Sequence, residues 1–169
     1  MGTSGVGSVD TQRLGRIGTL LNREVEEGRL MGAAVQVSIG GETTEPIVVG
    51  RRHLADETLP VTDDTIFLVA SITKPIVSAA VVKLVEEGSL VLDDPVARYV
   101  PEFAANGKEG VEVRHLLTHT SGLPDQIPEN RHYREAKRPL RDFVIRICEL
   151  PLSFTPGTQI SYQSSGIAM

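Results

Sequence analysis

Ser71 and Lys74 are the two residues of this chain whose types and spacing are best suited to covalent catalysis. Residues three positions apart on a helix share one face, so the amine of Lys74 can reach the hydroxyl of Ser71. A serine hydroxyl is a weak nucleophile until a base takes its proton. A lysine that is held neutral can take that proton without any histidine. The spacing therefore predicts a serine nucleophile that is activated by an amine.

The surrounding sequence predicts where this pair lies. Chance alone would place a serine three residues before a lysine in about one chain in four of this composition. Here the apolar residues 66–70 predict a buried strand, and the apolar run 76–85 predicts a buried helix that continues to about Glu87. Pro75 fits the first turn of that helix, where its missing N–H costs nothing. The alternative, a serine N-cap followed by a surface lysine, is electrostatically poor at a helix N-terminus.

Composition excludes several classes of function. The 169 residues are 40% hydrophobic and 23% charged, which is typical of one globular domain. The net charge of −5, the 4% of aromatic residues and the absence of a basic cluster argue against a nucleic-acid partner. The N-terminus lacks the pattern of a secretory signal, and no apolar stretch is long enough to span a membrane. The sequence therefore predicts a cytoplasmic protein without a membrane or nucleic-acid partner.

Three further residues have side chains that can bind metals or react, but the sequence favours a structural role for each of them. His115 and His119 have the i, i+4 spacing of a helical zinc pair, but a glutamate after the first histidine and a third ligand are both missing. Packing is therefore favoured over metal binding. The single cysteine, Cys148, excludes an internal disulfide framework, and its apolar helical surroundings predict a small buried core residue.

The periodicity predicts a helix and two strands in the first part of the chain, followed by helices. The helix covers residues 9–27, and the strands cover 31–39 and 46–50, with a turn at Gly40-Gly41. A loop over 51–64 precedes the strand at 66–70. Beyond Gly88 the pattern predicts short helices at about 95–99 and 113–119, an irregular segment at 123–135, an amphipathic helix at 139–150 and a turn at 154–158.

These elements predict an α+β fold in three parts. Residues 1–8 form a disordered tail, residues 9–88 the N-terminal part of an α/β domain with the nucleophile helix, and residues 89–169 a helical region. Three strands make a thin sheet, and the last residues, 167–169, lie at the start of a new helix that nothing terminates. We therefore expect a truncated chain that lacks the remaining sheet.

Four motifs together resemble the class C-like branch of the serine β-lactamase and penicillin-binding-protein superfamily. The first is Ser71-x-x-Lys74 after a predicted strand. The others are residues 90–95 (LVLDDP), residues 115–124 (HLLTHTSGLP) and the approach to Tyr162 over residues 154–162 (FTPGTQISY). They occur in the family's order and cover about residues 15–169. Each motif alone is unspecific, whereas the set of four is highly specific.

The resemblance implies an α/β sandwich with a helical domain and assigns roles to named residues. Ser71 would be the acylated nucleophile, and its backbone N–H would be one of two oxyanion donors. Lys74 would be the general base, or would keep Tyr162 reactive. Tyr162 would protonate the leaving group and later activate the deacylating water. The family implies no metal and no cofactor.

Two departures from the family pattern shape the functional prediction. The family's Tyr-x-Asn motif ends here in Ser164, whose hydroxyl is shorter and has fewer hydrogen-bonding groups than an amide. This weakens a role in β-lactam binding and favours an esterase, with Ser164 as a substrate-binding residue. The family also continues for about as many residues again, including a Lys/His-x-Gly strand motif that does not follow Tyr162 here.

The sequence therefore predicts a serine hydrolase that acts through an acyl-enzyme, with small acyl esters as the favoured substrates. The alternative within the family is a β-lactamase, D,D-peptidase or D-aminopeptidase acting on β-lactam-like substrates. The alternative outside enzymes is a non-catalytic fragment. We expect a second chain carrying the C-terminal half to be needed for activity.

Overall fold

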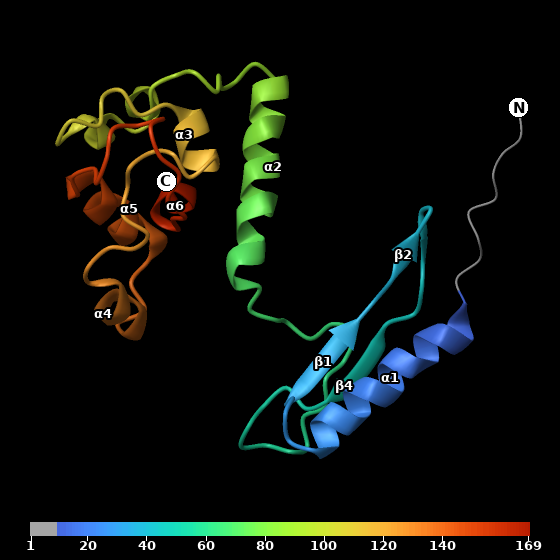
Figure 1. Ribbon diagram of the computed structural model, residues 1–169. Coiled ribbons are helices and arrows are strands. Elements are labelled where there is room, and N and C mark those ends of the chain that lie inside the picture. The colour runs from blue at the N-terminus through green and yellow to red at the C-terminus, as the bar shows by residue number, and fades with distance from the viewer. Residues whose placement is uncertain (1–9) are drawn as a thin grey trace, which may run out of the picture. The chain divides into compact units, whose positions relative to one another are not determined.

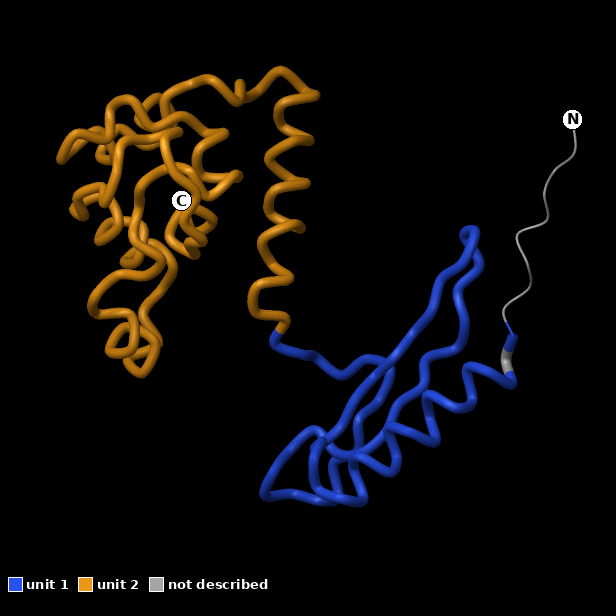
Figure 2. Tube along the Cα trace, viewed as in Figure 1, with its two compact units in different colours: residues 1–68 blue, residues 69–169 orange. Residues whose placement is uncertain are grey.

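The computed structural model describes residues 10–169 and divides them into two compact units. The first unit ends at Leu68, and the second runs from Val69 to Met169 (Figure 2). The tail predicted at residues 1–8 lies outside the described residues. The domain boundary that the sequence predicts after residue 88 stays a prediction. In this chain the helix that follows Ser71 belongs to the second unit.

The first unit begins with helix α1, Thr11–Glu26 (Figure 1). The side chain of Asp10 caps the helix by accepting a hydrogen bond from the backbone N–H of Arg13 at 3.0 Å. The helix ends before Gly28, whose φ of +71° places it in the left-handed region that glycine adopts without strain. Both helix ends thus lie close to those predicted from the sequence.

Two antiparallel strand pairs complete the first unit. Strand β1, Gly32–Val35, pairs with β4, Ile47–Gly50, and α1 packs against β4. Strand β2, Ser38–Ile39, and β3, Glu42–Thr43, form a hairpin around the predicted turn at Gly40-Gly41. The single strand predicted over 31–39 is therefore divided between two sheets.

The buried strand predicted at residues 66–70 is wrong. This segment has no regular structure up to residue 69 and then enters the 3-10 helix η1, Ala70–Ile72. Ile66 and Leu68 are both 96% exposed, and within residues 10–169 no strand pairs with them. An apolar run becomes a strand only where a neighbouring strand accepts and donates its backbone hydrogen bonds.

The second unit is built from helices and turns. Its longest helix is α2, Thr73–Glu86, and Pro75 lies in the first turn as predicted. The other elements follow in chain order: η2, Val96–Arg98; η3, Pro101–Ala104; α3, Val113–Leu117; α4, Asn130–Glu135; α5, Leu140–Glu149; and α6, Ser165–Ala168. Helix α4 corrects the prediction of an irregular segment over 123–135, since the Pro124 and Pro128 that suggested it both precede the helix.

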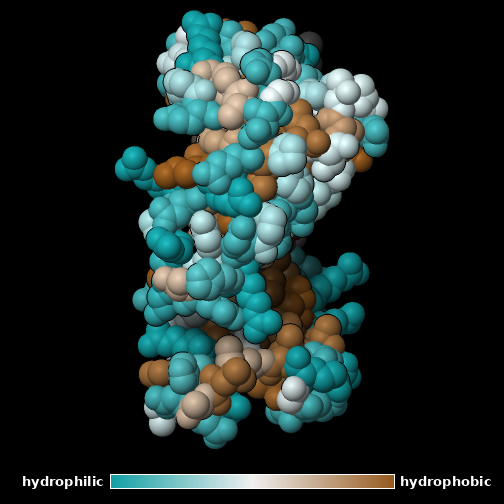
Figure 3. Space-filling model, turned by 90° about the vertical axis from the view of Figure 1, so that its left-hand side faces the viewer, coloured by the Kyte–Doolittle hydropathy of each residue, from teal (hydrophilic) through white to brown (hydrophobic). Residues whose placement is uncertain are grey.

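Helix α2 is not the buried helix that its apolar sequence predicts. The structure describes all of its residues, and none is buried. Ile76 is 62% exposed, and Val82 and Leu84 are each more than 40% exposed. Figure 3 shows apolar residues, in brown, among the hydrophilic residues on one face of the molecule. An apolar sequence sets the tendency to be buried, but burial itself depends on what covers the helix.

The core of the second unit gathers apolar residues from η2, η3, α3 and α5 and from neighbouring loops. Ten of them are buried together: Val96, Phe103, Val111, Val113, Leu116, Leu123, Ile127, Ile147, Cys148 and Leu150. The buried position of Cys148 confirms its prediction as a core residue. Lys108 is fully buried beside them, and its Nζ donates to the carbonyl oxygens of Cys148 at 2.8 Å and Leu150 at 2.7 Å. Within residues 10–169, no helix combines the length and apolar character needed to cross a membrane.

Candidate active site

Ser71, Lys74 and Tyr162 meet in the second unit. The phenol of Tyr162 donates a hydrogen bond to Ser71 Oγ over 2.7 Å. Lys74 Nζ donates to the same oxygen over 3.3 Å. Ser71 and Lys74 approach because Ser71 lies in η1 and Lys74 lies one turn later, at the start of α2. Tyr162 reaches them from 91 residues further along the chain. Ser71 Oγ therefore has two proton-transfer partners within reach.

The backbone before Ser71 has a conformation that is unusual for a residue with a side chain. Ala70 has a φ of +45°, in the left-handed region, and η1 then leads directly into α2. Such a conformation costs of order 1–3 kcal/mol outside glycine. It changes the chain direction immediately before Ser71, and the Ser71 side chain is exposed at this junction.

The environment of Tyr162 favours its ionised form. Lys74 Nζ lies 4.7 Å from the centroid of the phenol ring. The interaction with the Lys74 side chain, followed by the hydrogen bond with Ser71, lowers the pKa of Tyr162 from its ordinary value. The charge of Asp125 and desolvation oppose this shift. A tyrosine with a lowered pKa is a better general base near neutral pH than an unperturbed one.

His119 and the segment around Tyr162 hold one another in place. The two rings pack with centroids 4.8 Å apart and planes inclined by 40°. The carbonyl of His119 accepts from the N–H of Ser161 at 2.9 Å, and its Nδ1 accepts from the N–H of Gln163 at 3.3 Å. His119 is thus a packing residue of the site, which agrees with its structural interpretation.

A buried polar pair anchors the residue after Tyr162. The side chain of Gln163, 1% exposed, exchanges hydrogen bonds of 2.7 and 2.9 Å with the hydroxyl of Ser121. Next to it, Gly122 has a φ of +83°, and a Cβ there would lie 2.3 Å from the carbonyl oxygen of Phe154. Only glycine therefore lets the two segments of the family-like motifs approach this closely.

Ser164 extends the site beyond Tyr162. Its Oγ accepts a hydrogen bond from Lys74 Nζ at 3.3 Å. Its backbone N–H donates to Asp125 Oδ1 at 2.8 Å and to the Asp125 carbonyl at 3.0 Å. The residue at the position of the family's asparagine thus contacts Lys74 directly.

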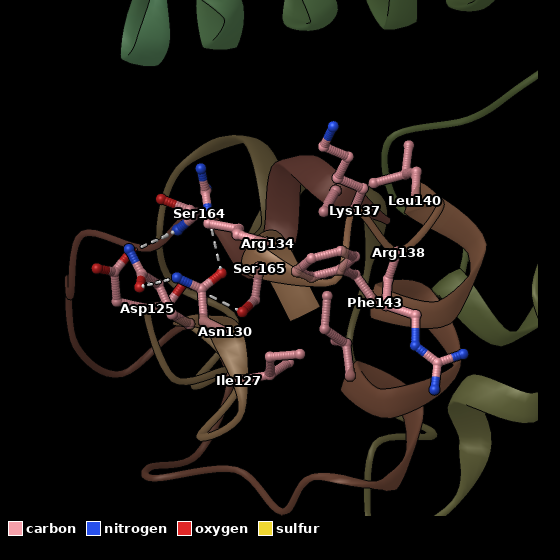
Figure 4. Close-up of a pocket in the computed structure, with 13 residues that line it drawn as sticks. Asp125, Ile127, Asn130, Arg134, Lys137, Arg138, Leu140, Phe143, Ser164 and Ser165 are labelled. Carbon is pink, nitrogen blue, oxygen red and sulfur yellow. Dashed lines mark hydrogen bonds between the residues drawn. The ribbon is translucent and has the colours of Figure 1, made fainter. Parts of the chain in front are cut away.

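A cavity of about 660 Å³ adjoins Ser164. Its lining combines apolar residues such as Ile127 and Phe143 with the cationic Arg134 and Lys137 (Figure 4). Figure 4 shows Asp125 and Ser164 on one side of this space and Phe143 on the other. The volume is in the range of small-molecule sites, so the cavity can hold part of a substrate bound next to Ser164.

His115 also has a structural contact. Its Nδ1 accepts from the backbone N–H of Glu112 at 3.1 Å, and the two residues form a capping box at the start of α3. Among residues 10–169, no cluster of three or more His, Cys, Asp or Glu side chains is arranged to hold a metal ion.

Four of the residues that meet at this site are predicted from the sequence, whereas Asp125 and the contact of His119 are not. Ser71, Lys74, Tyr162 and Ser164 are all brought together. No local sequence pattern points to Asp125, because its hydrogen-bond partner Ser164 lies 39 residues away in the chain.

The chain belongs to the beta-lactamase family. The family model described as Beta-lactamase matches residues 17–169, which is most of the chain. Its fold is therefore that of β-lactamases and transpeptidases, an α+β fold of which this chain carries a part. This confirms the resemblance inferred from the four motifs.

Known relatives include esterases and amidases. The chain is 40% identical to "Esterase EstB" of Burkholderia gladioli over 164 residues, covering 87% of this chain and 41% of the relative. A structure titled as a family VIII carboxylesterase matches with a TM-score of 0.75 and 25% identity, covering 99% of this chain and 45% of the other. A D-amino acid amidase from Ochrobactrum anthropi SV3 matches with a TM-score of 0.73 and 26% identity, covering 92% and 42%. The chain thus spans less than half the length of these proteins.

Proposed function

We propose that this chain carries the nucleophile, the base and the proton donor of a serine hydrolase that acts through a covalent Ser71 acyl-enzyme. The observation that carries the proposal is the convergence of Tyr162 Oη, at 2.7 Å, and Lys74 Nζ, at 3.3 Å, on Ser71 Oγ. A nucleophile within hydrogen-bond reach of its base is the arrangement that covalent catalysis requires. The match of this chain to the Beta-lactamase family model and its similarity to an esterase support hydrolysis as the class of reaction.

In the proposed reaction, the proton of Ser71 moves to the Tyr162 phenolate as Ser71 Oγ bonds to the carbonyl carbon of the ester. The tetrahedral intermediate then expels the alkoxide, which takes the proton from Tyr162. A water molecule repeats the sequence on the acyl-enzyme and releases the acid. Lys74 maintains the ionised form of Tyr162 by its positive charge, and the Ser71 N–H acts as one of the oxyanion donors.

The direction of the Tyr162 pKa shift predicts the pH dependence of acylation. Tyr162 must be ionised to act as a base, so the acylation rate rises with pH and levels off above the pKa of Tyr162. Because that pKa lies below its ordinary value, the rise is complete at a lower pH than for an unperturbed tyrosine with a pKa of about 10.

Small acyl esters are the favoured substrates. Ser164 presents a hydroxyl where an amide would hold the side chain of a lactam, and it is itself engaged with Lys74. An alkoxide also leaves more readily than an amine, so ester hydrolysis tolerates a less complete site. Comparing turnover of p-nitrophenyl butyrate with turnover of nitrocefin tests this preference. Faster nitrocefin hydrolysis would contradict it and favour a β-lactamase or D,D-peptidase.

Amide substrates are the second candidate within the family. The structural neighbour titled D-amino acid amidase favours an amidase or D-aminopeptidase. Release of ammonia from D-phenylalanine amide, measured beside butyrate ester hydrolysis on the same sample, would separate the two activities.

We further propose that full activity needs the part of the fold that the relatives have and these residues do not provide. The chain spans 41% of the esterase relative, and the apolar surface of α2 is exposed. If that part is a second chain, it will co-purify with this one and appear in the intact mass spectrum. Full esterase activity from a single species of this chain's mass would contradict the proposal and the alternative of a non-catalytic fragment.

A further inference from the structure

Asp125 is the centre of a hydrogen-bond cluster at the edge of the candidate site. Its Oδ1 and its carbonyl both accept from the N–H of Ser164, at 2.8 and 3.0 Å. The same carbonyl accepts from the N–H of Ser165 at 2.9 Å and from its hydroxyl at 3.1 Å. Figure 4 shows this cluster, in which one residue holds the backbone of two successive serines.

The cluster is continuous with the catalytic residues. Ser164, which Asp125 holds by its backbone, accepts from Lys74 Nζ through its side chain at 3.3 Å. Lys74 in turn donates to Ser71. A displacement of Ser164 would therefore remove one of the two side-chain hydrogen bonds that orient the ammonium.

We propose that Asp125 is a positioning residue of the proposed reaction, which holds Ser164 in place and through it fixes Lys74 against Ser71 and Tyr162. The inference rests on the proposed function for its catalytic consequence, because Asp125 touches none of the reacting atoms itself. Leu123 and Ile127, two residues before and after it in the chain, are buried in the core of the second unit. Asp125 is thus held by a segment that is fixed at two points.

Asp125 also influences the charge balance around Tyr162. Lys74 from α2 and His119 from the segment after α3 lie against this phenol, and the charge of Asp125 also acts on it. The Lys74 side chain and the hydrogen bond with Ser71 lower the pKa of Tyr162, whereas the negative charge of Asp125 raises it. The two roles of Asp125, holding Ser164 and opposing ionisation of Tyr162, can be separated by substitution.

Two variants separate the roles. Asp125→Asn keeps a side-chain oxygen acceptor for the Ser164 N–H and removes the charge, whereas Asp125→Ala removes the side-chain acceptor and the charge and leaves only the backbone carbonyl. Glu86→Gln is the matched control, because it removes an exposed carboxylate of the same unit that is paired with Lys83 and does not line the cavity. Circular dichroism shows whether each variant folds, and Ser164→Ala, which removes the hydroxyl that accepts from Lys74, carries the test if Asp125→Ala does not fold.

The first readout is the ultraviolet titration of Tyr162, taken as the difference in phenolate absorbance between each protein and its Tyr162→Phe counterpart. We expect the midpoint to move to lower pH in Asp125→Asn and to stay unchanged in Glu86→Gln. In Asp125→Ala the loosened Lys74 stabilises the phenolate less, so its midpoint should lie above that of the Asn variant. Equal midpoints in the Asn and Ala variants would overturn the proposal.

The second readout is the rate at which Ser71 is acylated by p-nitrophenyl butyrate. We expect a loss of about tenfold in Asp125→Ala, because a small displacement of a catalytic group has effects of this size, and a rate within about twofold of the parent in Asp125→Asn above its midpoint. An Asp125→Ala rate equal to the parent's would count against the positioning role. If the parent shows no acylation even in the presence of the rest of the fold, the proposed function fails, while the titration still decides the role of Asp125.

Discussion

The two units of this chain differ in how their polar and apolar residues are combined. Among the described residues of the first unit, Val49 and Val61 are the buried hydrophobic ones. The second unit has a core of ten buried residues and contains every residue of the candidate site. The polar groups of the candidate site are therefore placed in the unit that has the larger packed core.

Buried residues of the second unit lie close in the sequence to residues of the candidate site. Leu116 is buried three residues before His119, and Gln163 is buried immediately after Tyr162. His119 and Tyr162 therefore project from backbone next to buried core residues, whereas Ser71 and Lys74 lie on η1 and α2, which contain no buried residue. The core thus fixes the position of Tyr162, and Ser71 and Lys74 are positioned by the helix that carries them.

The largest expected effect is the loss of the nucleophile. Ser71→Ala should remove covalent acylation and lower the hydrolysis rate by about 10³-fold or more, since no other group takes its place. Intact mass spectrometry after reaction with a fluorophosphonate measures the acyl adduct. Ser89→Ala, an exposed serine of the same unit, is the control. An adduct that persists in Ser71→Ala would place the nucleophile elsewhere in the molecule.

Removal of the phenol should have the next largest effect. Tyr162→Phe should lower the acylation rate about 10²- to 10⁴-fold, the usual contribution of a general base, and abolish the rise of the rate with pH. The measurement is the pH–rate profile with p-nitrophenyl butyrate. Tyr133→Phe, whose ring packs on Phe143, should keep the parental profile. A Tyr162→Phe profile with the same pH dependence would assign the rise to another group.

The contrast in packing predicts unequal costs for the same substitution in the two units. Phe103 in the second unit is 0% exposed, whereas Phe67 in the first is 45% exposed. Phe103→Ala should lower the free energy of unfolding by about 3–5 kcal/mol, and Phe67→Ala by about 1 kcal/mol or less. Urea denaturation measures both. Equal losses would show that the two units do not differ in packing as described.

The smallest expected effect concerns two glycines with similar backbone angles. At Gly28 in the first unit a Cβ would have no atom within 4 Å, whereas at Gly122 it would meet the carbonyl oxygen of Phe154. Gly28→Ala should cost about 1 kcal/mol for its left-handed conformation, and Gly122→Ala about 2 kcal/mol or more because the backbone must also move. Urea denaturation tests the difference, and equal costs would show that the close approach at Gly122 has no energetic weight.

The sequence by itself determined the local features. The i, i+3 relation of Ser71 and Lys74, the proline in the first turn of α2 and the glycine after α1 each depend on a few neighbouring residues. Four motifs in family order also identified Tyr162 and Ser164, and the matching family model confirmed the family. Local geometry and motif order can be predicted because neither depends on which distant segments meet.

Only the tertiary structure decided which distant residues touch and which apolar segments are covered. Tyr162 meets Ser71 across 91 residues, and Asp125 holds Ser164 across 39, by contacts that no local pattern encodes. The apolar run at 66–70 gave neither the predicted strand nor the predicted burial, because both need a partner from elsewhere in the fold. Hydrogen-bond pairing and burial each require two surfaces in contact. A single segment of sequence specifies only one of those two surfaces.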